Sequence, residues 1–535
     1  MLTKSDSYRE LYDNFQWQIP ETYNIAADIC DKWVTGTRRR ALVFETHDGR
    51  TEEYSFEDVR RESNKLANVF ASKGITNGDR VAVLLPQHPM VAFAHLAAYR
   101  LGAIAVPLFT LFGPDALAFR LKDSGAKLIV TDGVGVQTLS TIRDSLPDLL
   151  HVLSVDSHGG SDSSPIDTLM DAASDSFDTK RTHADDPALI IYTSGTTGDP
   201  KGALLPHRSM LGHMPGVEFS HDFLGQRGDL IWSPADWAWI GGLVDVLFAA
   251  WQVGVPVLAK RFEKFDPELA ARLLSKYSVR NVFMPPTALK LMRSLPSKQF
   301  TGVNLRSIAS GGESLGEELQ SWSEANFGVP INEFYGQTEC NMTVSACSSL
   351  YGFKPGKIGR AAPGHRVEII DKSGNIQPHG EIGDIAVLSP NPVMFLRYWN
   401  NERATAEKFL GDWLVTGDIG VMDEEGYITF VGRDDDVITS AGYRIGPGPI
   451  EDCLIAHPQV QLAAVVGKPD ATRTQIVKAH VVLRPGLIPE SGLAEELKEW
   501  VKIRLSKHEY PREISFVDEL PRTNTGKIIR RLLRD

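Results

Sequence analysis

The sequence contains few cysteines and no long hydrophobic run. Only four of its 535 residues are cysteines, scattered at Cys30, Cys340, Cys347 and Cys453. Their spacing excludes a paired zinc motif and provides no disulfide framework. No run of about 18 apolar residues occurs, so we expect no membrane-spanning helix. The first residues lack the charged and then apolar pattern of a signal peptide. We therefore expect a soluble protein of a reducing compartment, the cytoplasm.

Basic residues are fewer than acidic residues. Lys and Arg total 56 against 68 Asp and Glu, which gives a net charge of −12. This balance argues against a general binder of nucleic acid or of an anionic membrane surface. An anionic substrate must therefore be held by local donors. The chain is too long for one hydrophobic core and should form at least two domains.

The most informative segment follows the apolar run Ala188–Ile191, which indicates a buried strand. The next residues combine hydroxyls, glycines and one cation, namely Thr193, Ser194, Gly195, Thr196, Thr197, Gly198 and Lys201. Glycines let backbone N–H groups curl around an anion, hydroxyls donate hydrogen bonds, and the lysine adds charge. These are the requirements for holding a polyphosphate. The spacing does not fit G-x-x-x-x-G-K-[ST], and on composition alone a flexible surface loop is the alternative.

Further motifs follow in order along the chain. They are Asn332–Glu339, Trp413–Asp418, Gly432–Ile438 with Gly442–Gly446, and Pro521–Lys527. Together with the 193–201 segment they resemble the adenylate-forming (AMP-binding) superfamily, which contains acyl-CoA synthetases, peptide-synthetase adenylation domains and beetle-type luciferases. The resemblance extends from about Tyr54 to the end of the chain and is closest to the short- and medium-chain acyl-CoA synthetases.

The pattern of elements indicates an α/β fold. Ser55–Asp58 reads as a capping box that begins a helix running towards Ala71. Arg80–Leu85 and Ala103–Pro107 read as strands with a helix over 91–100 between them, and this alternation recurs up to residue 309, which predicts parallel sheets with crossover helices. A helix is also expected over residues 496–504. Residues 357–430 show short, interrupted strands typical of a β-barrel subdomain. The resemblance implies a large N-terminal domain of doubly wound sheets, residues 1–433, and a small mobile α+β C-terminal domain, residues 434–535.

The resemblance also implies a reaction. A carboxylate attacks the α-phosphate of ATP, pyrophosphate leaves, and the thiol of coenzyme A then takes the acyl group from acyl-AMP. Because two anions must meet, the main catalytic problem is electrostatic. No protein nucleophile is needed, and neither a G-x-S-x-G nor an H-E-x-x-H motif occurs.

Three residues match the catalytic positions of the family. Lys527 would bridge the attacking carboxylate and the α-phosphate, and Thr338 would donate to that phosphate. Glu339 would hold Mg²⁺, because a carboxylate that faces a polyphosphate needs a cation between them. Two alternatives come from the residues alone: Glu339 could be a charge at a helix N-terminus, and Lys527 could belong to a solvated basic tail with Arg522, Arg530, Arg531 and Arg534.

The remaining nucleotide contacts are carried over in the same way. Asp418 matches the ribose-binding aspartate, although its alternative is a turn aspartate beside a glycine, and Arg433 would also reach the ribose. Tyr335 is expected to stack on adenine. Apart from the 193–201 loop, the expected ATP-binding residues are Gly312, Glu313, Ser314, Glu333, Phe334, Tyr335, Gly336, Gln337, Asp418, Arg433 and Arg444.

Three positions belong to the second half-reaction. Family members rotate the C-terminal domain to admit the thiol, and Asp435 matches the hinge. After rotation Gly442 would line the coenzyme A tunnel, where a side chain would obstruct it, and Arg444 would contact phosphate.

The acyl pocket is expected along Ser233–Gly242. Its expected lining residues are Trp237, Trp239, Ile240, Gly241 and Gly336. The two tryptophans could equally be core aromatics. Acetate-specific relatives carry tryptophan at the position of Gly336, so glycine should open a channel for an acid longer than acetate, including branched, thioether or small aromatic acids.

The sequence thus predicts an AMP-forming acyl-CoA synthetase that uses ATP, Mg²⁺ and coenzyme A, has no nucleic-acid partner, and whose assembly as a homodimer is left open. One alternative is an adenylation enzyme that loads an amino or aryl acid onto a carrier protein, with Asp236 as the candidate partner of the α-amine. A luciferase-like oxygenase and a non-catalytic nucleotide-binding module are the other two.

Overall fold

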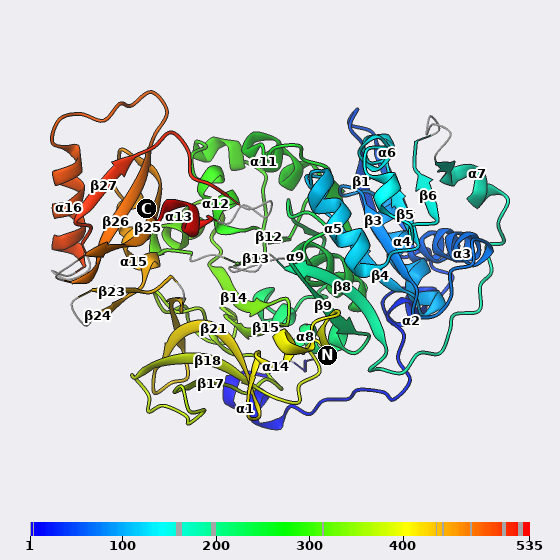
Figure 1. The fold of residues 1–535 in the computed structure, drawn as a ribbon, viewed down its shortest axis with the longest axis horizontal. Coiled ribbons are helices and arrows are strands. Elements are labelled where there is room, and N and C mark those ends of the chain that lie inside the picture. Colours follow the sequence, from blue (N-terminus) through cyan, green and yellow to red (C-terminus); the bar gives the residue numbers. More distant parts are fainter. Residues whose placement is uncertain are drawn as a thin grey trace.

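The computed structural model describes residues 2–3, 5–156, 163–193, 200–312, 315–434, 436–440, 443–470, 473–505, 510–522 and 528–534, without the side chains of residues 439, 443 and 444. Within these ranges, no helix has both the length and the apolar character needed to span a bilayer. Figure 1 shows two α/β layers, a curved β subdomain and a C-terminal unit at the left edge of the view.

The first sheet has eight strands in the order β19-β9-β8-β4-β3-β5-β6-β7. Its strands are β3 (Arg80–Leu84), β4 (Ile104–Pro107), β5 (Leu128–Thr131), β6 (His151–Ser154), β7 (Ser164–Pro165), β8 (Pro187–Thr193), β9 (Lys201–Pro206) and β19 (Arg397–Tyr398). β3 pairs in parallel with both β4 and β5, which confirms the expected βαβ pattern. The Ser55 side chain caps α3 (Phe56–Ser72) in a capping box with Asp58, also as expected.

The second sheet has nine strands in the order β16-β15-β14-β13-β12-β10-β11-β1-β2. Its strands are β1 (Arg40–Glu45), β2 (Thr51–Ser55), β10 (Ile231–Trp232), β11 (Val257–Lys260), β12 (Asn281–Phe283), β13 (Ser307–Gly311), β14 (Ile331–Gln337), β15 (Cys340–Ser345) and β16 (Arg360–Ala361). β10 to β14 are parallel, and β15 turns back antiparallel to β14. The carboxyl ends of the parallel strands therefore lie along one edge.

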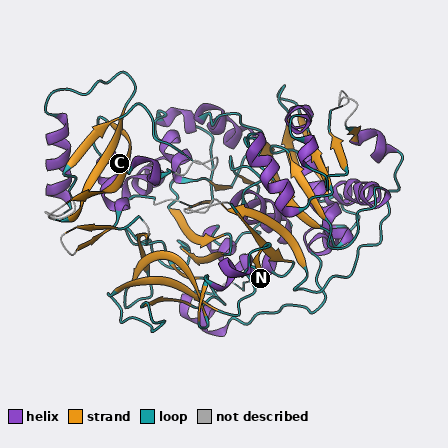
Figure 2. Cartoon of the chain, viewed as in Figure 1, coloured by secondary structure: helices purple, strands orange, loops and turns teal. Residues whose placement is uncertain are grey.

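Helices cover the sheets and fill the space between them (Figures 1 and 2). Before residue 334 they are α1 (Tyr8–Asn14), α2 (Ile25–Ile29), α4 (Pro89–Leu101), α5 (Pro114–Ser124), α6 (Gly133–Ser140), α7 (Ile166–Asp171), α8 (Ser209–Ser220), α9 (Ile240–Gly242), the π-helix η3 (Leu243–Phe248), α10 (Ala249–Gln252), α11 (Pro267–Lys276), α12 (Pro286–Met292) and α13 (Glu317–Phe327). Every residue of α8 and of η3 is buried, and both belong to the main hydrophobic core with β3 and β8.

The third sheet is the expected β-rich subdomain, an antiparallel and strongly curved sheet (Figure 2). It consists of β17 (Val367–Ile370), β18 (Ile382–Leu388), β20 (Phe409–Leu410), β21 (Trp413–Met422) and β22 (Ile428–Arg433). The strand order is β17-β18-β21-β20, and β22 pairs with β21. The short helix α14 (Glu402–Ala406) leads into β20.

The C-terminal unit has its own core, built from Ile438, Ile450, Val465, Val481 and Leu497 among others. Its elements are β23 (Ile438–Ser440), β24 (Tyr443–Ile445), α15 (Pro447–Ile455), β25 (Val460–Asp470), β26 (Thr474–Leu483), α16 (Leu493–Arg504) and β27 (Glu513–Phe516). The helix expected over 496–504 lies inside α16. The boundary at 433/434 stays a prediction: Asp434 accepts a hydrogen bond from Lys372 in the preceding sheet, whereas Asp436 pairs with Arg530.

Candidate active site

Thr338 and Glu339 form the tip of a hairpin. β14 and β15 pair through Gln337 and Cys340, so the two residues between them make the turn. Glu339 is only 6% exposed, and its Oε1 accepts a hydrogen bond from the Tyr398 hydroxyl. The alternative that Glu339 is a charge at a helix N-terminus is therefore wrong.

The stem of the expected phosphate loop lies beside the same tyrosine. β8 and β9 form a hairpin in which Thr193 lies opposite Lys201. The Lys201 ammonium is 5.3 Å from the centre of the Tyr398 ring, because β19, which carries Tyr398, pairs with β9. Tyr398 thus connects the cation of this loop with the carboxylate of Glu339.

Asp418 lies in strand β21 and is 6% exposed, so its interpretation as a simple turn aspartate is wrong. Its Oδ2 accepts hydrogen bonds from the Tyr335 hydroxyl at 2.6 Å and from the Gln337 amide at 2.9 Å. Arg433 lies directly opposite it on β22. The two expected ribose residues are therefore cross-strand neighbours at the end of β14.

The pKa of Asp418 is raised overall, because burial outweighs the neighbouring groups that favour the ionised form. Burial raises the pKa of Asp418, whereas the hydrogen bonds from Tyr335 and Gln337 and the nearby cations Arg433 and Lys408 lower it. A carboxylate with this support accepts charge-assisted hydrogen bonds, which are stronger than those of a neutral acid. The arrangement is suited to binding two hydroxyl groups.

The expected adenine segments lie where β13 and β14 end. Gly312 follows β13 with a φ of +92°, a conformation that favours glycine. Phe334 packs with its ring centre 5.2 Å from that of Phe283. Glu333 is buried, and burial together with nearby Asp452 of α15 raises its pKa to about 8. The stacking role of Tyr335 stays a prediction, and its hydroxyl is engaged by Asp418.

Aromatic side chains form an apolar surface beside the acyl-pocket segment. Trp237 is 1% exposed and belongs to the main core, which agrees with its alternative as a core aromatic. Trp239 is half-buried, and its ring centre lies 5.6 Å from that of Phe283. A Cβ added at Gly241, next to Ile240 in α9, would lie 2.9 Å from the Trp239 ring. Trp239, Phe283 and Phe334 thus form a continuous apolar surface.

The open channel expected at Gly336 stays a prediction, and the structure gives a second reason for a glycine at this position. A Cβ at this position would lie 2.5 Å from the backbone nitrogen of Met342 and 2.6 Å from Cα of Asn341. Both atoms belong to β15, and the Asn341 side chain is anchored at 2.9 Å to the buried Asp245. Glycine is needed here because the neighbouring strand passes too close for any side chain.

This crowding gives a testable expectation for Gly336→Ala. We expect the free energy of unfolding to fall by about 1–3 kcal/mol, as for other overpacked sites. The value of kcat/KM should fall by the same factor for each acid, so that the preference among acids does not change. Denaturant unfolding and an acid series measure the two effects. Gly352→Ala is the control, because no heavy atom lies within 4 Å of its added Cβ. A changed chain-length preference at unchanged stability would instead support an open acyl channel at Gly336.

Sequence reasoning missed two residues of this site. Tyr398 contacts Glu339, and the Lys408 ammonium donates to Gln337 Oε1 at 2.9 Å and to the carbonyl of Thr416 at 3.0 Å. Neither residue belongs to a recognisable motif. Tyr398 reaches the site through the pairing of β19 with β9, and Lys408 through its position before β20.

Several expected site residues lie outside the described residues. They are Ser194, Gly195, Thr196, Thr197, Gly198, Glu313, Ser314, Asp435, Gly442 and Lys527, together with the side chain of Arg444. Their roles stay predictions.

The site residues fit the expected magnesium ion. Among the described residues, no three His, Cys, Asp or Glu side chains gather in a metal-binding group. Mg²⁺ commonly binds one or two carboxylates together with substrate phosphates and water. A single buried carboxylate, Glu339, near the stem of the phosphate loop therefore suits an ion that arrives with ATP.

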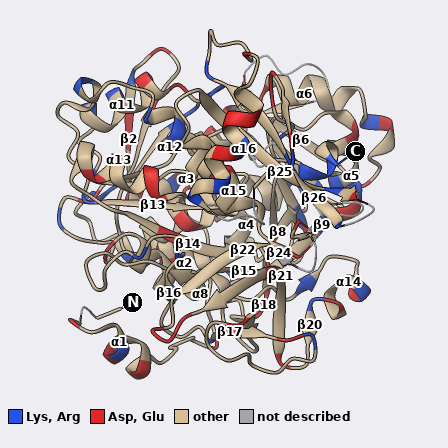
Figure 3. Cartoon of the chain, turned by 90° about the vertical axis from the view of Figure 1, so that its left-hand side faces the viewer, with Lys and Arg blue, Asp and Glu red and all other residues tan. Residues whose placement is uncertain are grey.

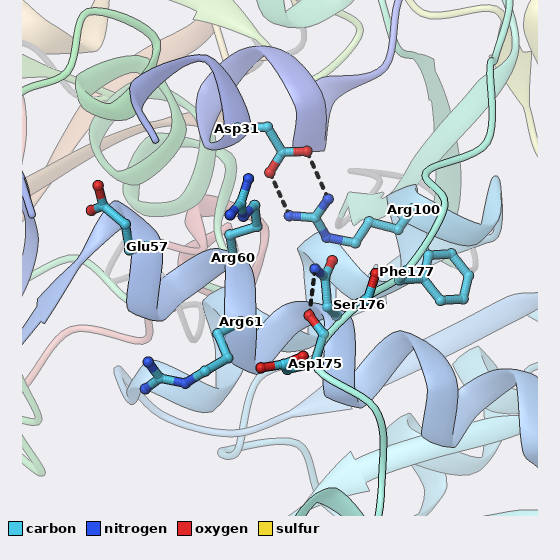
Figure 4. A pocket seen from close by; sticks show the side chains of 9 residues that line it. Asp31, Glu57, Arg60, Arg61, Arg100, Asp175, Ser176 and Phe177 are labelled. Carbon is cyan, nitrogen blue, oxygen red and sulfur yellow. Dashed lines mark hydrogen bonds and ion pairs between the residues drawn. The ribbon is translucent and has the colours of Figure 1, made fainter. Parts of the chain in front are cut away.

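A cavity of 470 Å³ lies elsewhere, between α3, α4 and the segment 175–177 (Figure 4). Two of its arginines are paired with acidic neighbours: Arg100 binds Asp31 at 2.7 Å, and Arg61 binds Asp58 at 2.9 Å. None of its lining residues belongs to the motifs. We regard it as a polar crevice separate from the active site.

Two arginines of the basic C-terminal segment form ion pairs within the C-terminal unit. Figure 3 shows Lys and Arg segments beside the C-terminus. Arg530 pairs with Glu451 at 2.8 Å and with Asp436 at 3.3 Å, and Arg534 also pairs with Asp436. These two arginines are engaged within the fold, which argues against a nucleic-acid surface at this place.

Comparison with known proteins agrees with this geometry. The AMP-binding enzyme model matches residues 31–399, and the AMP-binding enzyme C-terminal domain model matches residues 449–527. The mitochondrial acyl-coenzyme A synthetase ACSM3 of Rattus norvegicus is 35% identical over 99% of this chain and 93% of its own length. The acetyl-coenzyme A synthetase of Bacillus subtilis (strain 168) is 34% identical over 99% and 93%.

A solved structure shows the same fold with a bound adenylate. The anthranilate CoA ligase AuaEII in complex with anthranoyl-AMP superposes with a TM-score of 0.88, at 28% identity over 96% of this chain and 97% of the other. The motifs, the two family models and these relatives agree along nearly the whole sequence. The chain therefore belongs to the AMP-binding enzyme family and, within it, to the AMP-forming acyl-CoA synthetases.

Proposed function

We propose that this enzyme activates a short- to medium-chain carboxylic acid longer than acetate. ATP and the acid form acyl-AMP and pyrophosphate, and coenzyme A then takes the acyl group and releases AMP. The observation that carries the proposal is a convergence of four residues from different strands: Glu339 after β14, Asp418 within β21, Arg433 at the end of β22 and Lys201 at the start of β9. This set supplies donors and cations for a nucleotide beside an apolar wall.

Each residue has a defined task in adenylation. Asp418 and Arg433 would hold the ribose and the 193–201 loop the β- and γ-phosphates, and Glu339 would hold Mg²⁺, which would supply positive charge beside those phosphates. Thr338 donates to the α-phosphate. Lys527 brings the acid carboxylate and the α-phosphate together, which is electrostatic stabilisation where charge is concentrated. Movement at Asp435 then places Gly442 along the thiol route and Arg444 near phosphate.

The aromatic surface of Trp239, Phe283 and Phe334 supports an apolar acid. One relative is named for acetate and one structural neighbour for anthranilate, so the acids tested should range from a two-carbon acid to an aromatic acid. Asp236 does not favour an amino acid, because its Oδ1 accepts a hydrogen bond from the backbone of Ala238 at 2.7 Å, which gives this carboxylate a local structural role.

The test is CoA-dependent AMP release across an acid series from acetate to dodecanoate, with branched, thioether and aromatic acids. Each methylene that fits the pocket should raise kcat/KM, since it contributes about 1–3 kcal/mol. We expect the maximum between butyrate and octanoate. A maximum at acetate would contradict the proposed acid, and adenylate formation without transfer to coenzyme A would favour the carrier-protein alternative.

Two further proposals concern the cellular compartment and the oligomeric state. Among the described residues all four cysteines are free, three of them buried, which supports a reducing compartment such as the cytoplasm. A homodimer is proposed for test by light scattering.

A further inference from the structure

Lys408 is a half-buried cation next to the carboxylate of Asp418. Its ammonium donates to Gln337 Oε1 at 2.9 Å and to the Thr416 carbonyl at 3.0 Å. The other end of the Gln337 amide donates to the same carbonyl at 2.8 Å and to Asp418 Oδ2 at 2.9 Å. Lys408, Gln337 and Asp418 therefore form a chain of hydrogen bonds.

The lysine and the two acceptors of the amide nitrogen together fix the direction of this chain. A glutamine amide has a donor end and an acceptor end, and either can face a carboxylate after a rotation of the side chain. An ammonium group has donors only, so its contact with Oε1 keeps the NH₂ end of Gln337 towards Asp418. Without Lys408, the amide oxygen loses its donor, and only the two hydrogen bonds of the amide nitrogen hold Gln337 in place.

The charges around Lys408 agree with this arrangement. Burial lowers the pKa of Lys408, while Glu339 and Asp418 favour its charged form and Arg433 opposes it. The lysine in turn favours the ionised form of Asp418. A second donor, the Tyr335 hydroxyl, converges on the same Oδ2 at 2.6 Å.

We propose that Lys408 is a positioning residue for the ribose site, which orients Gln337 so that Asp418 faces the nucleotide as a correctly aligned, charged acceptor. The inference rests on the proposed function in one respect, the assignment of Asp418 to the ribose. Lys408 then contributes to the preference for a ribose over a deoxyribose without touching the nucleotide.

The test is calorimetric binding of AMP and of 2′-deoxy-AMP to the whole protein, which requires no knowledge of the acid. Lys408→Met keeps a similar length and removes the charge and the donors. We expect the affinity for AMP to fall about ten- to hundredfold, the range of one charge-assisted hydrogen bond. Binding of 2′-deoxy-AMP, which keeps only the 3′-hydroxyl for Asp418, should fall by a smaller factor, so that the ratio of the two affinities decreases.

Matched variants separate positioning from other roles. Lys408→Arg retains a donor-only cation and should keep most of the ratio. Lys127→Met removes a lysine that pairs with Asp79 in the first sheet and should leave the ratio unchanged. Because both ligands are measured on one preparation, the ratio does not depend on how much protein is folded.

Two outcomes would overturn the proposal in distinguishable ways. An equal loss for both nucleotides in Lys408→Met would show that Lys408 acts on the phosphate or only on stability. Equal binding of both nucleotides by the unaltered enzyme would remove Asp418 from the ribose, and the assignment of Lys408 with it. CoA-dependent turnover is tested separately, so a failure of the proposed acid leaves the binding result interpretable.

Discussion

Replacing Lys527 with alanine will abolish acyl-AMP formation and leave the transfer of pre-formed acyl-AMP to coenzyme A near its normal rate. The first half-reaction brings the carboxylate of the acid against the phosphates of ATP, and the lysine offsets that repulsion. The second half-reaction starts from an adenylate in which that repulsion is gone. We expect kcat for adenylation to fall at least about 10²–10³-fold, the effect of removing one preorganised electrostatic group.

Pyrophosphate exchange measures the first half-reaction, and thioester formation from synthetic acyl-AMP measures the second. Lys502→Ala serves as the control, because this lysine of α16 pairs at the surface with Glu499 at 2.7 Å. Since Lys527 belongs to the part of the chain outside the described residues, the prediction rests on the motif Pro521–Lys527. Equal losses in both half-reactions would contradict the assigned role.

Glu339→Gln should be the second most damaging change. The amide keeps the shape of the side chain and can still accept a hydrogen bond from Tyr398, so the hairpin should remain folded. It loses the charge that makes Glu339 a hard anionic ligand for Mg²⁺. We expect kcat/KM for ATP to fall about 10²-fold and the Mg²⁺ concentration for half-maximal activity to rise.

Titration of Mg²⁺ at fixed ATP separates this effect from a general loss of activity. Glu425→Gln is the control, because Glu425 is an exposed residue that pairs with Lys354 at 2.5 Å. An unchanged Mg²⁺ dependence in Glu339→Gln would remove the carboxylate from the metal site.

Local patterns predicted much of the fold. The strand expected from Arg80 is β3, and the helix expected over 91–100 lies inside α4, which begins at Pro89 behind the capping side chain of His88. Such agreement is expected because hydrophobic periodicity and caps act over a few residues. The same patterns carry no information on which distant strands pair.

The candidate site shows the same difference between what local motifs predict and what distant segments contribute. Glu339 and Asp418 were predictable because they stand in motifs, but their surroundings were not. The backbone of β15 beside Gly336, the Tyr398 hydroxyl on Glu339 and the ammonium of Lys408 on Gln337 all come from segments far away in the sequence.

The amino-acid sequence by itself determined the family, the sheet-and-helix pattern and the chemical groups offered to a nucleotide. Only the tertiary structure decided that the backbone of β15 crowds Gly336 and that Tyr398 and Lys408 join the site. The physical reason is strand register. Pairing of β19 with β9, of β15 with β14 and of β22 with β21 sets these contacts, and register depends on packing across the whole sheet.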